Sequence, residues 1–137
     1  MDTGIVMKEV EKVPGASVTF TITSLIEGVW FGLGTLLIPG VFLQMVFLTD
    51  GSSIELYFFR SIGVLCLALA AGCWYARTGN RGEVKMMSLI MSIAKVGTTV
   101  VLILMMIETA AQPIGYLNPV LTAFLAVLNV RQYMITK

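Results

Sequence analysis

Histidine is absent from this chain of 137 residues, and cysteine occurs only twice. Without histidine, a Ser-His or Cys-His catalytic unit cannot form. The usual ligand sets of zinc, haem and iron–sulfur clusters are also missing from the chain itself. Cys66 and Cys73 lie in one apolar run, on one helix face but too far apart for a disulfide. We therefore expect no catalytic residue and no metal site, and we expect both cysteines to be buried packing residues.

Charge is also scarce, and this decides the class of protein. Charged residues make up 12% of the chain, against roughly 25% in soluble proteins, and the formal net charge is only +1. So small a charge does not attract nucleic acid. Hydrophobic residues make up 57%, and the mean hydropathy is +0.89. The composition predicts an all-α integral membrane protein.

Four apolar runs are long enough to cross the ~30 Å hydrocarbon core as helices. They follow a polar N-terminal arm, residues 1–16, and form one transmembrane domain, residues 17–137. Pro39-Gly40 should end the first span, and residues 41–48 are too short to cross, so we expect a short interfacial helix there. The sequence thus predicts a four-helix bundle with spans of about residues 17–38, 54–76, 86–107 and 118–133.

Basic residues outside these spans gather on one side of the predicted bundle. Arg77, Arg81 and Lys85 surround the turn between the second and third spans, and other basic residues flank the two ends of the chain. The connections 39–53 and 108–117 contain none. The positive-inside rule then places both termini and the basic loop in the cytoplasm, or its organellar equivalent. We expect a multi-pass protein of the bacterial inner membrane or an equivalent organellar membrane.

Two ions of opposite charge lie near the middle of predicted spans. Glu27 and Lys95 are each about ten residues from the inner end of their span, which puts both near ~15 Å depth. Because isolated ions are costly in a bilayer, we expect them to pair, with the pair completed by Ser92, Thr98 or Thr99 hydroxyls. The pair either fixes the helix register or relays ions. By the same arithmetic, Arg60 and Glu108 form a second predicted pair near the outer side.

Glycines predict where helices approach closely. Gly28 and Gly32 form a small-xxx-small pattern in the first span, and Gly63 lies in the second. The second span resembles small four-helix bacterial membrane proteins of the DoxX-like type, because it contains Arg60-x-x-Gly63 followed by Leu67, Gly72 and Ala76-Arg77. The glycine-rich first span, which ends at Pro39, resembles the same proteins. The resemblance covers about half the chain. It implies a compact bundle with both termini inside and a link to quinone-side redox complexes, and it supplies no catalytic residue.

These observations favour a non-catalytic accessory subunit of a larger photosynthetic or respiratory membrane complex, which would mediate helix and lipid packing. The alternative is a small oligomeric transporter or channel with a Glu27–Lys95 relay. A third hypothesis is an enzyme acting on lipid or quinone at the 77–85 loop, with Glu83 as its only general base. We expect no intrinsic cofactor; a lipid, carotenoid or chlorophyll would be held by apolar contacts, or by oxygens such as those of Asn118 or Gln112. The expected partners are lipids and subunits of the larger complex.

Overall fold

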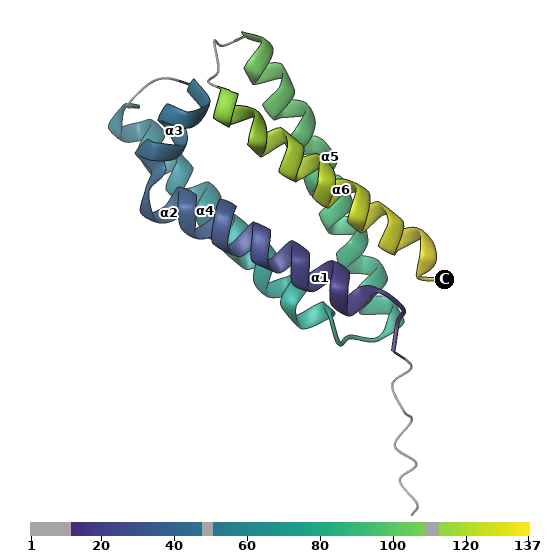
Figure 1. Cartoon of the computed structure of the whole chain (residues 1–137). Coiled ribbons are helices and arrows are strands. Elements are labelled where there is room, and N and C mark those ends of the chain that lie inside the picture. Colours follow the sequence, from purple (N-terminus) through teal and green to yellow (C-terminus); the bar gives the residue numbers. More distant parts are fainter. Residues whose placement is uncertain (1–11, 48–50, 109–112) are drawn as a thin grey trace, which may run out of the picture.

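A computed structural model describes residues 12–47, 51–108 and 113–137, and four of its helices are long and apolar enough to span a membrane (Figure 1). The predicted four-helix membrane protein is therefore confirmed. Most of the predicted N-terminal arm, together with Gln112, lies outside the described residues. In chain order the elements are α1 (Ala16–Leu25), η1 (Ile26–Leu33), α2 (Gly34–Leu37), α3 (Pro39–Phe47), α4 (Ser53–Ala76), α5 (Arg81–Glu108), η2 (Pro113–Tyr116) and α6 (Leu117–Ile135).

The first span is continuous from Ala16 to Leu37, but its middle is a π-helix, η1. A π-helix has a wider turn than an α-helix, with hydrogen bonds from residue i to i+5, and it occurs frequently at functional sites. Glu27 lies in its first turn, and Gly28 and Gly32 are buried within it. Ile38 leaves the helical region with φ −128° and ψ 53°, so the first span ends directly before Pro39, as predicted.

Side-chain caps determine where the next two spans begin. The predicted capping box at the start of α4 is present: the Glu55 N–H donates to Ser52 Oγ at 3.3 Å, and the Glu55 side chain accepts from the Ser52 backbone. A second pair of the same kind starts α5, where the Glu83 N–H donates to Asn80 Oδ1 at 3.0 Å and the Asn80 N–H donates to Glu83 Oε2 at 2.9 Å. Because of this cap, α5 begins at Arg81, earlier than predicted.

The bundle consists of two helix pairs, with the first span beside α4 and α5 beside α6 (Figure 1). Glycine allows close approach in the first pair, as predicted. A Cβ atom on Gly32 would lie 2.8 Å from Leu67 of α4, and one on Gly63 would lie 2.7 Å from Thr35 Oγ1; Gly28 faces Ala70. A methyl group at Gly32 or Gly63 would therefore push α4 away from the first span.

The start of α1 and the C-terminus lie at one end of the bundle, which we call the terminal end; the other is the distal end (Figure 1). Gln132 Nε2 donates to the Pro14 carbonyl at 3.1 Å, which joins the end of α6 to the start of α1. Arg81 donates to the Lys137 carbonyl at 3.3 Å, which joins the start of α5 to the end of the chain. The even number of spans thus brings the start of α1, the C-terminus and the α4–α5 turn together.

The predicted pair of Arg60 and Glu108 is wrong. Arg60 instead lies over the ring of Tyr57, 5.5 Å from its centroid, and Glu108 is exposed at the end of α5. Similar depth in a membrane is not sufficient for pairing, because each side chain must also face the other helix. At this level a cavity lies between α4 and α5, and neither Arg60 nor Glu108 lines it.

Candidate functional site

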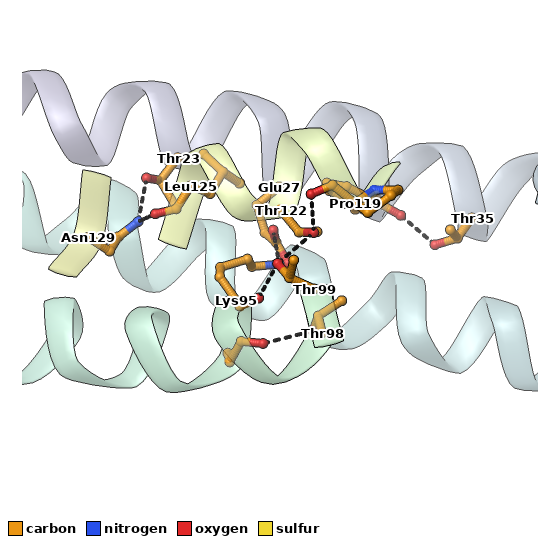
Figure 2. A network of polar contacts seen from close by, with 12 residues as sticks. Thr23, Glu27, Thr35, Lys95, Thr98, Thr99, Pro119, Thr122, Leu125 and Asn129 are labelled. Atoms are coloured by element: carbon orange, nitrogen blue, oxygen red, sulfur yellow. Dashed lines mark hydrogen bonds and ion pairs between the residues drawn. The ribbon is translucent and has the colours of Figure 1, made fainter. Parts of the chain in front are cut away.

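The predicted ion pair of Glu27 and Lys95 is present at the centre of the bundle (Figure 2). Lys95 Nζ contacts Glu27 Oε2 directly, and the two residues are only 3% and 0% exposed. Glu27 comes from η1 and Lys95 from α5, so the pair joins the two helix pairs of the bundle. The ring of Phe31 also covers the ammonium group, 5.3 Å from its centroid. Two ions that would each be costly in lipid therefore neutralise one another inside protein.

The hydroxyl groups expected to complete the pair have other partners. Thr98 and Ser92 donate to the carbonyls of Ala94 and Ser88 on their own helix. Thr99 Oγ1 lies 2.7 Å from the Lys95 carbonyl and 2.9 Å from Thr122 Oγ1 of α6 (Figure 2). No hydrogen bond from a described residue reaches Glu27 Oε1. This part of the prediction is wrong because serine and threonine in a helix readily bond the carbonyl one turn back.

The distal side of the pair faces an apolar cavity of about 480 Å³ between α4 and α5. Glu27 and Lys95 line the inner end of this cavity. Its walls are almost entirely apolar and include Phe31, Phe42, Phe59, Ile62, Leu69, Ala94, Leu102 and Met105. The cavity is partly open, and its rim includes Phe58, Leu65 and Val101, which are 67%, 64% and 53% exposed on the outside of the bundle. Exposed apolar side chains around the opening indicate that it faces acyl chains rather than water.

The terminal side of the pair contains an apolar core, formed by Ala16, Phe20, Cys73, Ala76, Val84 and Met91, and also a set of buried polar side chains, which we call the polar layers. Thr19 Oγ1 donates to Gln132 Oε1 at 3.2 Å, and one turn deeper Asn129 Nδ2 donates to Thr23 Oγ1 at 3.1 Å (Figure 2). The antiparallel register of α5 and α6 places Ser88 near the level of Gln132 and Ser92 near that of Asn129. The outer layer is therefore Thr19, Ser88 and Gln132; the middle layer is Thr23, Ser92 and Asn129; the deep layer is Glu27 and Lys95.

A second, smaller cavity of about 140 Å³ lies beside the outer layer at the terminal end. Thr19 and Gln132 line it, together with Gly15 and Arg131. Gly15 has a left-handed conformation with φ 76°, and a Cβ there would lie 3.1 Å from Gln132 Oε1. Glycine is thus needed both for the turn before α1 and for the room beside Gln132.

The basic residues predicted for the α4–α5 turn lie at the terminal end but only partly in a loop. Arg77 caps α4 and stacks on Trp74 at 3.6 Å, whereas Arg81 and Lys85 belong to the first turns of α5. Lys85 lies 5.6 Å from the ring centroid of Tyr133. Arg81 and Lys85 therefore contact residues near the C-terminal end of the chain, whereas Arg77 contacts a residue of its own helix. Glu83 is held by the α5 cap rather than being available as a base.

Other candidate residues have mixed outcomes. Cys73 is buried as expected, but Cys66 is only half-buried and lines the apolar cavity. Asn118 also lines the cavity, and its side-chain oxygen accepts a hydrogen bond from Trp30 Nε1 at 3.0 Å. Among residues 12–47, 51–108 and 113–137, no three His, Cys, Asp or Glu side chains lie close enough to hold a metal ion.

Sequence reasoning missed the polar layers and the cavity. A signal for the layers exists: Thr19, Thr23 and Glu27 recur every four residues, and Ser88, Ser92 and Lys95 are four and three residues apart, so each set lies on one face of its helix. The cavity has no such signal, because it depends on how far α4 and α5 separate. Comparisons with protein-family models, with curated proteins and with solved structures find no match to this chain.

Proposed function

We propose that this chain is a non-catalytic membrane protein that binds the acyl chain of a membrane lipid in the cavity between α4 and α5. The observation that carries this proposal is the cavity itself, about 480 Å³ with apolar walls and an apolar, exposed rim. Its volume falls within the roughly 300–1,000 Å³ typical of small-molecule sites. A lateral opening at this depth admits a molecule that is dissolved in the bilayer.

The chemistry of the walls favours a hydrocarbon chain over a polar ligand. Phenylalanine and aliphatic side chains supply dispersion contacts and have no hydrogen-bonding groups. The two charges at the inner end of the cavity are paired with each other, and Phe31 lies over the ammonium group. A lipid headgroup could thus remain at the distal membrane surface while its chain fills the cavity.

Lipid binding fits the role expected from the sequence, an accessory subunit of a photosynthetic or respiratory membrane complex. We propose that the bound lipid and the exposed apolar faces of α4 and α5 contact larger subunits, with both termini in the cytoplasm. Purification in a mild detergent should then co-isolate a larger partner in fixed proportion. A chain that is always recovered alone contradicts the accessory role but leaves lipid binding open to its own test.

That test compares two phenylalanine substitutions on one turn of α5. Ala94 lines the cavity, whereas the neighbouring Ile93 is 66% exposed on the outer surface. Native mass spectrometry of protein from lipid nanodiscs should detect bound phospholipid in the wild type and in Ile93→Phe, and a severalfold loss in Ala94→Phe. Equal lipid retention by both variants would contradict the proposed site. An absorption spectrum of the same sample identifies a carotenoid or chlorophyll if one occupies the cavity instead.

A further inference from the structure

The polar layers are unusual for the inside of a membrane bundle, because every level contains an unsatisfied oxygen. Ser88 Oγ in the outer layer, Asn129 Oδ1 in the middle layer and Glu27 Oε1 in the deep layer have no hydrogen-bond partner among the described residues. All three residues are 0% exposed. A buried polar group without a partner destabilises the folded state, because it loses its hydrogen bonds to water on folding. Three such costs at successive levels of one interface call for a common explanation.

From these oxygens we propose that the polar layers hold a file of water molecules that carries protons between the Glu27–Lys95 pair and the aqueous phase at the terminal end. This function is separate from lipid binding, which uses the opposite side of the pair. Buried waters typically occupy polar sites where they make two to four hydrogen bonds. Each layer offers such a site from two or three helices.

The spacing of the layers suits a continuous hydrogen-bonded path. One helical turn rises 5.4 Å, which is about two hydrogen-bond lengths. A single water between side chains of neighbouring layers therefore completes the connection from one turn to the next. The threonine and serine hydroxyls both donate and accept, so they can belong to the path, while Asn129 and Gln132 orient the waters.

The path has an opening at one end and a barrier at the other. At the terminal end, the 140 Å³ cavity beside Thr19 and Gln132 gives water access to the outer layer. Beyond Glu27 and Lys95, the apolar walls of the larger cavity offer waters few hydrogen-bond partners. The polar layers are thus a half-channel that ends at the ion pair and does not cross the bilayer.

Proton exchange along this path does not change the charge of the site. Glu27 first accepts a proton from the Lys95 ammonium group, which leaves a neutral carboxyl group and a neutral amine. The Lys95 amine then takes a proton from the water file, and Glu27 releases its proton to the same file. The pair is restored at each cycle, so neither ion stays buried without its partner. Exchange of the Lys95 Nζ protons with bulk water is consequently the property that tests for the half-channel directly.

The experiment uses NMR to measure magnetisation transfer from water to the Lys95 Nζ protons. The sample is ¹⁵N-lysine-labelled protein in lipid nanodiscs, and the Lys95 resonance is assigned by its loss in Lys95→Arg. The wild type should show transfer. The double variant Thr23→Val/Asn129→Leu replaces the bonded pair of the middle layer with apolar groups of similar size, and should reduce transfer about tenfold or more. The control Ser61→Ala removes an exposed hydroxyl that bonds only Tyr57 of its own helix, and should leave transfer unchanged.

A second variant keeps the test decisive if the first disturbs the fold. Thr19→Val/Gln132→Leu closes the outer layer far from the ion pair, so it should reduce transfer while the Lys95 chemical shift stays that of the wild type. A wild type without transfer would overturn the proposal. Transfer that survives closure of both layers would also overturn it, because water would then reach Lys95 from the lipid cavity.

Discussion

At the scale of single residues, Glu27 and Lys95 separate two different interiors within one small bundle. On their terminal side, buried hydroxyl and amide side chains lie beside an apolar core that includes Phe20, Val84 and Met91. On their distal side, phenylalanine and aliphatic groups line a cavity. An ion pair tolerates both neighbours, because its charges cancel toward the apolar cavity while Glu27 Oε1 remains without a hydrogen-bond donor among the described residues. The position of this pair, rather than any reactive side chain, therefore defines the site.

Gly63 provides a prediction at the same scale. A Cβ atom there would lie 2.7–2.8 Å from Thr35 Oγ1 and from backbone atoms of the first span. Gly63→Ala should therefore lower the free energy of unfolding by about 1–3 kcal/mol, the usual cost of overpacking. Unfolding in mixed micelles with increasing dodecyl sulfate measures this change.

Gly97 is the matched control for that substitution. It lies in the interior of α5, where an added Cβ would meet no atom within 4 Å. Gly97→Ala should raise the free energy of unfolding by about 0.5–1 kcal/mol through helix propensity alone. A loss of stability at Gly97 as large as that at Gly63 would show that close packing is not what glycine provides at Gly63.

At the scale of elements, the sequence predicts helices better than it predicts their contacts. Long apolar runs, Pro39 and the Ser52 capping box each act locally, so the ends of the spans were predicted within about two residues, except that α5 begins at Arg81 instead of residue 86. The π-helix at Ile26–Leu33, which packs against α4, was not predicted from the sequence. The Arg60–Glu108 pair failed because depth along a helix does not determine direction around it.

Capping of α4 is a testable property of a single element. Ser52 accepts from the Glu55 N–H, so Ser52→Ala should cost about 1 kcal/mol of stability and speed hydrogen exchange in the first turn of α4. Ser61→Ala, in the same helix, removes a hydroxyl that bonds only the carbonyl of Tyr57 and should change neither quantity appreciably. Equal exchange rates in the two variants would argue against a capping role.

At the scale of the whole molecule, the even number of spans gives the bundle two chemically different ends. The terminal end carries Arg77, Arg81, Lys85 and Arg131, the start of the polar layers and the smaller cavity. The distal end carries α3, η2 and the apolar cavity. In the two proposals, water enters the polar layers from the terminal end, and a lipid chain enters the apolar cavity in the distal half of the bundle. Both proposals therefore require this difference between the two ends.

Cysteine labelling tests this topology directly. In a background with Cys66→Ala and Cys73→Ala, Thr78→Cys lies at the terminal end and Ser53→Cys at the distal end, and both positions are exposed. A membrane-impermeant maleimide applied to intact spheroplasts should label Ser53→Cys only, and Thr78→Cys should react only after lysis. The reverse pattern would place the termini outside, and labelling of both from one side would contradict the four-span arrangement.

The central claim is that Glu27 and Lys95 form a buried ion pair inside the protein. A double-mutant cycle of unfolding free energies, with Glu27→Gln and Lys95→Met, tests this claim most directly. Each single variant leaves one buried charge unpaired and should lose about 3–5 kcal/mol. The double variant removes both charges and should be more stable than either single variant. If the two losses instead add in the double variant, the ions do not interact, and the site described above does not exist in the membrane.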